Sequence, residues 1–191
     1  MQENHIRKSI LDAAEGRFSH YGYSKTTVAE IAADCGMSVG NIYRFFDNKE
    51  AIAMAGVEKK MNEKLAVCEQ ATDPTSSAVE QLRQYMLARL RHTHQMSCGG
   101  EHLFELVELI TRKHADLIQH FDECISNKLT HILQQGIERG ELRSMDAARE
   151  AGSIMLATTV FCVPVFMREP LSVMETRLND LIDLLYQGLK T

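Results

Sequence analysis

The chain has 191 residues, of which 45% are hydrophobic and three are prolines, and its formal net charge is −5. This composition is typical of a globular protein and excludes a disordered chain or one that holds nucleic acid through a general basic excess. The five cysteines never form a C-x-x-C pair, so we expect reduced thiols. The N-terminus lacks the uninterrupted apolar region of a signal peptide, and the most apolar run, residues 154–167, is too short to span a bilayer, so we expect a cytoplasmic protein without a membrane partner.

Apolar residues recur at helical spacing from the start of the chain. The first expected helix covers residues 4–21, with Ile10 and Phe18 facing inward and Gly22 as its C-terminal cap. No segment alternates with period two for long enough to form a sheet. The sequence therefore predicts an all-α fold.

The next segment contains the most specific pattern of the chain. Thr26 or Thr27 can cap a second helix, and Glu30 lies at capping-box distance from Thr27. Gly36 follows the last periodic residue, where a left-handed conformation ends a helix at little cost. Ser38 can then cap a third helix, expected over residues 39–46. Two helices across a short turn with glycine indicate a helix-turn-helix, whose second helix enters the major groove of DNA.

A set of residues in the first quarter of the chain matches one family pattern: Phe18, Tyr21, Gly22, Tyr23, Thr26, Thr27, Val28, Ile31, Ala32, Cys35, Gly36, Met37, Ser38, Gly40, Asn41, Ile42, Tyr43, Phe46, Lys49 and Glu50. With these residues the chain resembles the TetR family of bacterial transcriptional repressors. Two positions depart from the family pattern. Cys35 replaces the usual Ala, and Phe45 replaces a His or Tyr, so a phosphate contact from residue 45 is not expected.

The resemblance implies which residues touch DNA. The third helix would present Val39, Gly40, Asn41 and Arg44 to the major groove, where Asn41 suits adenine and Arg44 suits guanine. Taken alone, Asn41 and Arg44 would be assigned to a solvated helix face, but the surrounding motif favours the DNA reading. Further residues would contact phosphates and fix the register on DNA: Thr27, Ser38, Tyr43 and Lys49.

Charge is unevenly distributed along the chain. Residues 1–60 carry eight Lys or Arg against eight Asp or Glu, whereas residues 61–191 carry thirteen against eighteen. The predicted DNA-binding part is thus neutral, and we expect modest affinity per subunit that dimerisation increases. The acidic second part permits a cationic or a neutral apolar inducer.

A fourth helix is expected over residues 48–71, and it places the domain boundary near residue 50. Residues 1–50 would form the DNA-binding domain, and residues 51–191 a helical domain for ligand binding and dimerisation. In that second domain we expect helices over residues 77–95, 101–113, 116–139, 146–163 and 171–189.

The last helix carries apolar residues at steps of three and four, close to a heptad seam. An ordinary core helix gives the same pattern. Combined with the apolar helix before it, the seam favours a homodimer through the last two helices. The residues expected at this interface are Ile154, Met174, Leu178, Leu181 and Leu185.

A ligand pocket is predicted only loosely, because its residues could equally be core. Adaptable methionines, aromatic rings and one threonine form the candidate lining: Met86, Leu90, Phe104, Val107, Phe121, Met155, Thr159 and Phe161. The ligand would be a small-molecule inducer of unknown identity.

Other functional classes find less support. A metal-sensing repressor is the first alternative, because potential ligands gather near residue 97: His92, His94, Cys98, Glu101, His102 and Glu105. His92 and His94, two residues apart on a helix, point in different directions. Residues 36–40 match G-x-S-x-G, but no strand precedes the serine as the nucleophile elbow requires. We therefore expect no catalytic site, no cofactor and no metal.

The sequence thus predicts a ligand-responsive transcriptional repressor that binds a palindromic operator as a homodimer. By resemblance to the family, an inducer would change the separation of the two recognition helices, which must match half-sites roughly 34–36 Å apart. The second alternative is a helix-turn-helix interaction protein without a ligand response.

Overall fold

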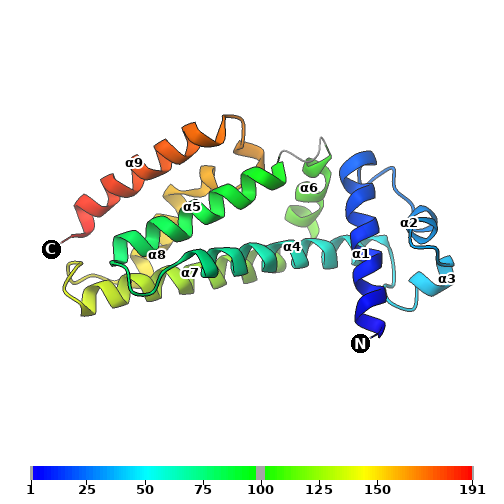
Figure 1. Ribbon diagram of the computed structural model, residues 1–191, viewed down its shortest axis with the longest axis horizontal. Coiled ribbons are helices and arrows are strands. Elements are labelled where there is room, and N and C mark those ends of the chain that lie inside the picture. Colours follow the sequence, from blue (N-terminus) through cyan, green and yellow to red (C-terminus); the bar gives the residue numbers. More distant parts are fainter. Residues whose placement is uncertain (1, 98–101, 191) are drawn as a thin grey trace. The chain divides into compact units, whose positions relative to one another are not determined.

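The computed structural model describes residues 2–97 and 102–190, which form nine α-helices and two short 3₁₀ helices without a strand (Figure 1). The predicted all-α fold is confirmed. The helices are α1 (Gln2–Tyr21), α2 (Val28–Asp34), α3 (Val39–Ile42), α4 (Lys49–Ala71), α5 (Ala78–Ser97), α6 (Leu103–Lys113), α7 (Ala115–Glu138), α8 (Ala147–Ala157), η1 (Thr159–Phe161), η2 (Pro164–Phe166) and α9 (Leu171–Leu189).

The chain divides into two compact units. Unit 1 comprises Met1–Asn62 and Gly99–Ile118, and unit 2 comprises Glu63–Cys98 and Gln119–Thr191. This grouping differs from a boundary at residue 50, because the first half of α4 and all of α6 belong to unit 1. The division at residue 50 stays a prediction about functional domains.

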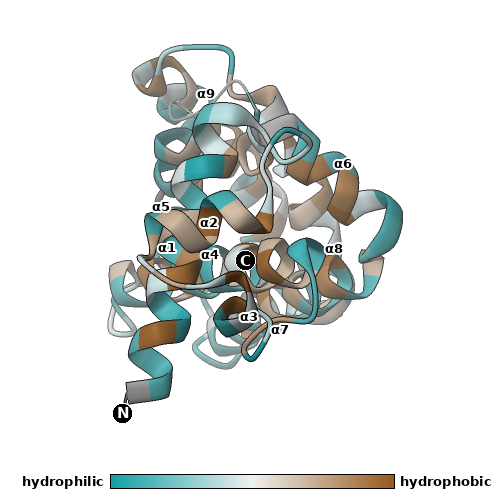
Figure 2. Cartoon of the chain, turned by 90° about the vertical axis from the view of Figure 1, so that its right-hand side faces the viewer, coloured by the Kyte–Doolittle hydropathy of each residue, from teal (hydrophilic) through white to brown (hydrophobic). Residues whose placement is uncertain are grey.

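Unit 1 has its own apolar core. Ile10 of α1, Ile31 of α2, Ile42 of α3 and Ile52 of α4 are each almost fully buried in it. Leu106 of α6 packs against the same core. In Figure 2, α6 carries hydrophobic residues (brown) as well as hydrophilic ones (teal), as an amphipathic helix does. Five helices therefore share one core, from which α2 and α3 present their outer faces.

Two helices end earlier than the sequence predicts. The third helix was expected to reach residue 46, but α3 ends at Ile42. The backbone N–H groups of Arg44 and Phe45 donate to carbonyls three residues earlier, which forms a tighter turn. The helix expected over residues 146–163 ends at Ala157, where the Thr158 hydroxyl donates to the Ile154 carbonyl at 2.7 Å. Hydroxyls that bond to the preceding turn weaken a helix.

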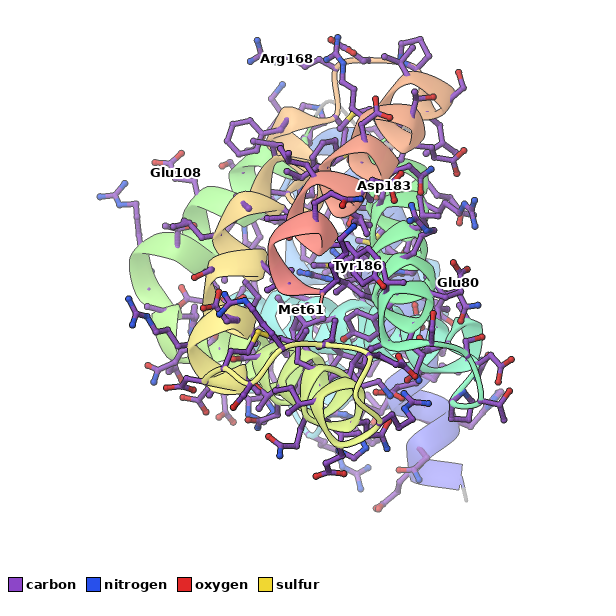
Figure 3. All side chains as sticks on the ribbon, turned by 90° about the vertical axis from the view of Figure 1, so that its left-hand side faces the viewer. Met61, Glu80, Glu108, Arg168, Asp183 and Tyr186 are labelled. Carbon is purple, nitrogen blue, oxygen red and sulfur yellow. The ribbon has the colours of Figure 1, made fainter. Side chains whose placement is uncertain are left out.

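Unit 2 is a bundle in which α5 and α9 lie side by side. Tyr85 and Leu90 of α5 share its core with Leu178 and Ile182 of α9, and α7 and α8 add further apolar residues. Outside this core, Arg83 pairs with Asp183 across the two helices. Figure 3 labels Asp183 and Tyr186 on α9 and Glu80 on α5. Such exposed ion pairs add little stability, so the bundle is held mainly by its apolar core.

Gly136 of α7 is the point of closest approach in unit 2. A Cβ atom there would lie 2.6 Å from Cβ of Ala78 and 2.7 Å from Cδ1 of Leu142. We expect Gly136→Ala to lower the free energy of unfolding by about 1–3 kcal/mol, because Cβ of Ala78 is fixed to the backbone and cannot move away unless the start of α5 moves. Urea denaturation of the purified protein measures this.

A glycine-to-alanine substitution at Gly16 is the control, because the added methyl group there meets no neighbour. A Cβ atom at Gly16 of α1 meets no atom within 4 Å. Gly16→Ala should therefore stabilise the protein by about 0.5–1 kcal/mol, as expected for alanine in an exposed helix. Equal denaturation midpoints for the two variants would contradict the packing at Gly136.

Candidate nucleic-acid interface

Unit 1 builds α2 on a complete capping box. The Glu30 backbone N–H donates to Oγ1 of Thr27 at 3.3 Å, and Oε2 of Glu30 accepts the Thr27 N–H at 2.7 Å. The predicted box is confirmed, with Thr27 as the cap. Thr26 is instead buried, and its hydroxyl donates to the Gly22 carbonyl at 2.8 Å. These contacts fix the start of α2 through local chain chemistry.

A glycine turn joins α2 to α3. Gly36 has a φ of +64°, and the next N–H, of Met37, donates to the Ala32 carbonyl at 2.8 Å. This left-handed cap ends α2 in the way predicted. Ser38 then caps α3, since its Oγ accepts the Asn41 N–H at 3.2 Å. The two caps set the angle between the helices.

The outer face of α3 is open to a partner. Val39 is 36% exposed, Tyr43 is 50% exposed, and Arg44 is also exposed. Among the described residues, no ion pair or hydrogen bond engages the Arg44 side chain. Gly40 adds no side chain, and a Cβ atom there would reach only Oγ of Ser38, at 4.0 Å. Asn41 is half-buried. Of the predicted base-contacting residues, Val39, Gly40 and Asn41 thus lie on α3, and Arg44 lies in the turn that follows it.

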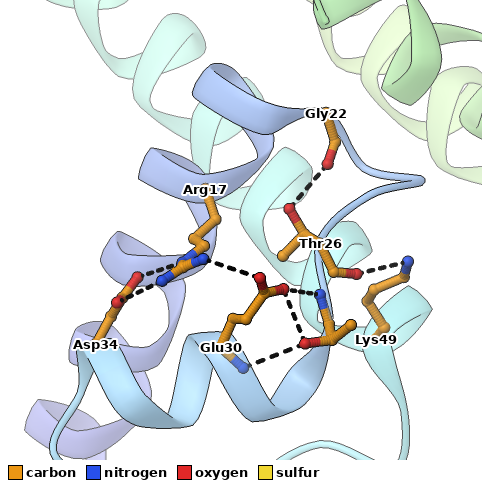
Figure 4. A network of polar contacts seen from close by, with 7 residues as sticks. Arg17, Gly22, Thr26, Glu30, Asp34 and Lys49 are labelled. Carbon is orange, nitrogen blue, oxygen red and sulfur yellow. Dashed lines mark hydrogen bonds and ion pairs between the residues drawn. The ribbon is translucent and has the colours of Figure 1, made fainter.

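An ion-pair network braces α2 against α1 (Figure 4). Nε and Nη2 of Arg17 donate to the two carboxylate oxygens of Asp34 at 2.6 and 2.8 Å, and Nη1 lies 3.3 Å from Glu30. The Arg17 hydrogen bond holds the pKa of Asp34 below its usual range, and the Thr27 backbone N–H does the same for Glu30. Bidentate pairs of this kind add geometric specificity. Sequence patterns gave no sign of the network, because its members lie 13 and 17 residues apart.

Lys49 has an internal role beside its predicted phosphate contact. Its Nζ donates to the carbonyls of Tyr23 and Thr26, both at 2.9 Å, and lies 4.3 Å from the centroid of the Tyr23 ring. An ammonium has three N–H donors, so one remains for another acceptor. The Lys49 side chain therefore holds the loop before α2 in place, and its contact with a phosphate stays a prediction.

Two carboxylates of unit 1 hold α6 in place. Oε2 of Glu105 accepts the Ser24 N–H at 2.8 Å in the loop between α1 and α2, and this bond lowers the pKa of Glu105. Glu50, at the start of α4, accepts from Nζ of Lys113 at 2.8 Å, and its other oxygen lies 2.9 Å from Nε2 of His114. Both ends of α6 are thus tied to the elements that position the helix-turn-helix.

The metal hypothesis gains no support from the described residues. Within residues 2–97 and 102–190, no three His, Cys, Asp or Glu side chains lie close enough together to hold a metal ion. Cys98 and Glu101 lie outside the described residues. His102 lies 3.3 Å from Glu105, the residue that binds Ser24. His94 lies 3.3 Å from the carbonyl of Glu169.

The predicted pocket residues are divided between the two units. Unit 2 contains Met86, Leu90, Phe121, Met155, Thr159 and Phe161, and all of them except exposed Thr159 are buried or half-buried. Val107 is on α6 in unit 1, together with Phe104, whose side chain lies outside the described part. These residues remain a prediction. Met86, Leu90 and Phe161 belong to the core of unit 2, and Met155 packs against that core.

The predicted dimer residues are already covered within the protomer. Ile154, Met174 and Leu178 are buried in the core of unit 2, and Leu181 and Leu185 are half-buried against it. Other apolar residues of α8 and α9 face outward, with Leu156 79% and Leu184 70% exposed. A partner that covers these helices would therefore meet Leu156 and Leu184.

No helix in the described ranges is both long and apolar enough to cross a membrane.

Known proteins share these features. The family model for bacterial regulatory proteins of the tetR family matches residues 10–55, and that for the tetracyclin repressor-like C-terminal domain matches residues 78–180. The fatty acid metabolism regulator protein of Bacillus subtilis is 26% identical over 186 residues, which cover 94% of this chain and 93% of the relative.

Solved structures have the same fold. SmeT of Stenotrophomonas maltophilia, the repressor of the multidrug efflux pump SmeDEF, has a TM-score of 0.69 and 25% identity, over 97% of this chain and 90% of that one. A transcriptional regulator from Cytophaga hutchinsonii has a TM-score of 0.74 and 20% identity, over 95% and 97%. With a capped helix-turn-helix and both family models matched, the chain belongs to the TetR family of bacterial transcriptional regulators.

Proposed function

We propose that this regulator is a homodimeric repressor that binds a palindromic operator and is released by a small-molecule inducer. The observation that carries the proposal is the exposed surface of α3 and of the turn that follows it. Val39 is exposed on α3, Tyr43 is its exposed C-cap, and Arg44 lies exposed in the turn, while the Ser38 side chain caps the start of the helix. An exposed arginine directly after the recognition helix, without an ion pair to any described residue, suits the O6 and N7 atoms of guanine. Thr27 and Ser38, at the starts of α2 and α3, support contacts with phosphates.

Dimerisation is supported by the exposed leucines of unit 2. Leu156 of α8 and Leu184 of α9 are 79% and 70% exposed, so each helix has a large apolar side chain on its outer face. An isologous interface through α8 and α9 would cover both and would place two helix-turn-helix elements on one operator. Because the DNA-binding part has no net positive charge, each subunit should bind DNA only modestly. Two linked helix-turn-helix elements that bind two half-sites would supply the missing affinity.

The release step rests on the path of the chain between the units. α4 begins in unit 1 and ends in unit 2, and along the sequence α6, which belongs to unit 1, comes between the two segments that form unit 2. An inducer in unit 2 that moved these helices would disturb the spacing of the recognition helices. Inducer and operator would then weaken each other by typically ~1–3 kcal/mol. The relatives that regulate fatty acid metabolism and repress an efflux pump support a regulatory role but do not identify the inducer.

Selection from a random duplex library with the purified protein tests operator binding. We expect enrichment of a palindrome whose half-sites are about one helical turn apart. Enrichment of a single, non-repeated site would contradict the dimer, and no enrichment from ligand-free, refolded protein would contradict operator binding.

Arg44→Ala then tests the recognition surface. The variant should lose about 1–3 kcal/mol of operator affinity and relax specificity at one base position, because the bidentate contact with guanine is lost. The control is Arg112→Ala on α6, which removes the same charge from an exposed side chain paired with Glu108. Equal losses in the two variants would show that only net charge matters.

A further inference from the structure

Unit 2 contains two buried or half-buried cations from different helices. Lys64 of α4 donates from Nζ to Oγ1 of Thr93 at 2.6 Å and to the Cys162 carbonyl at 3.1 Å. Thr93 is fully buried, and its hydroxyl in turn donates to the Arg89 carbonyl at 2.8 Å. Lys64, Thr93 and the end of η1 therefore meet inside the bundle beside Arg89 of α5.

Arg89 is only 7% exposed, and its side chain has no charged partner in the described part of the chain. Its Nε is buried without a hydrogen-bond acceptor, and Nη1 reaches only the Sδ atom of Met86, at 3.6 Å. No carboxylate of the described residues lies within ion-pair distance of Arg89 or Lys64. Burial of an unpaired charge is costly, and arginine does not lose its proton in proteins.

The surrounding groups do not neutralise these cations. Asp122 of α7 is near enough for its charge to act on both, but it is exposed and forms no ion pair with either. Burial raises the pKa of Cys68 to about 11 and also raises that of Tyr85, so both stay neutral. Burial, and then the charge of Arg89, lower the pKa of Lys64 to about 8. The interior thus holds excess positive charge although unit 2 lies in the acidic part of the chain.

We propose that the inducer of this regulator carries an oxyanion head group, a carboxylate or a phosphate, on an apolar body, and that Arg89 and Lys64 bind this head group. The inference rests on the proposed function, since it names the ligand class for unit 2. Arg89 has a free Nε–H donor, and Lys64 has one N–H beyond its two bonds. Met86 lies against Arg89, and the buried Cys68 and Tyr85 lie near enough for the charge of Arg89 to act on them, which supplies largely apolar surroundings. This reverses the expectation of a cationic or neutral inducer.

Two matched series of compounds test the charge of the ligand. Octanoate, octyl phosphate, octanol and octylamine share one chain, and benzoate, benzyl phosphate, benzyl alcohol and benzylamine share one ring. Calorimetric titration of the purified full-length protein, without DNA, should show binding of the carboxylate or the phosphate at least about tenfold tighter than the alcohol and amine of its series. The carboxylate and phosphate arms distinguish the two head groups. Absence of oxyanion binding, or equal binding of the amines, would overturn the proposal.

Substitutions then assign the site. Arg89→Met and Lys64→Met should each weaken binding of the preferred oxyanion on the order of tenfold or more, while binding of the matched alcohol stays unchanged. The control Arg91→Met removes an exposed guanidinium on the same helix, paired with Glu175 at 2.6 Å, and should bind as the parent protein does. If Arg89→Met fails to fold, Lys64→Met gives the same test. An oxyanion preference that persists in every folded variant would overturn the assignment.

Operator release is measured separately, on the protein–DNA complex. Oxyanion binding without operator release would leave this site in place and contradict the proposed function. Release by amines or alcohols alone would support the proposed function and overturn the oxyanion site.

Discussion

Ile42→Ala is expected to lower the free energy of unfolding of unit 1 by about 2–5 kcal/mol and to abolish operator binding. Ile42 is fully buried and is the only residue of the four-residue α3 in the core of unit 1. Truncating a fully buried isoleucine removes its transfer free energy and leaves a cavity. A helix of four residues has almost no stability of its own. The position of α3 therefore depends on the burial of the Ile42 side chain. Urea denaturation and an operator titration measure the two effects.

Val39→Ala is the matched control on the same helix. Val39 is 36% exposed, so the substitution should change stability by no more than about 0.5 kcal/mol. Operator affinity should still fall, because Val39 is proposed to face the groove. Equal loss of stability in the two variants would show that α3 is held by its caps and not by Ile42.

The helix-turn-helix could be predicted from sequence because its determinants are local. The capping box joins Thr27 to Glu30, the left-handed turn requires Gly36, and Ile31 and Ile42 have the spacing of inward faces. Each signal spans only a few residues, where backbone chemistry alone selects the structure. The early end of α3 escaped prediction, because apolar residues continue to Phe46 after the backbone has tightened into turns.

The position of α6 could not be predicted, because it depends on distant contacts. Ser24 and Glu105 are 81 residues apart, and Glu50 and Lys113 are 63 apart. An acidic residue near histidines suggested a metal ligand, whereas the carboxylate of Glu105 accepts a hydrogen bond from a backbone N–H.

The burial of Arg89, by contrast, could be predicted from the sequence. Arg89 lies three residues after Met86 and four before Thr93, on the buried face of α5. A charged residue on the otherwise buried face of a helix indicates a candidate ligand-binding site.

Leu184→Glu is expected to convert the proposed homodimer to a monomer. A heptad seam shows that a helix has an apolar stripe, but not whether its own protomer or a partner covers it. In this chain Met174 and Leu178 face the core, and Leu184 lies 70% exposed on another face of α9. A carboxylate there costs the isolated protomer little, but it would be buried opposite its own copy in an isologous interface. Sedimentation equilibrium measures the change of mass.

The same variant should bind a two-site operator on the order of 100-fold more weakly than the parent, because linked half-sites supply at least that much avidity. Val67→Glu is the control: it adds the same charge at an exposed apolar residue of α4, and it should remain dimeric. Since both substitutions are exposed, thermal denaturation should show both protomers folded, which separates loss of the partner from loss of the fold. A dimeric Leu184→Glu with full operator affinity would place the interface away from α9, and the exposed leucines would then need another partner.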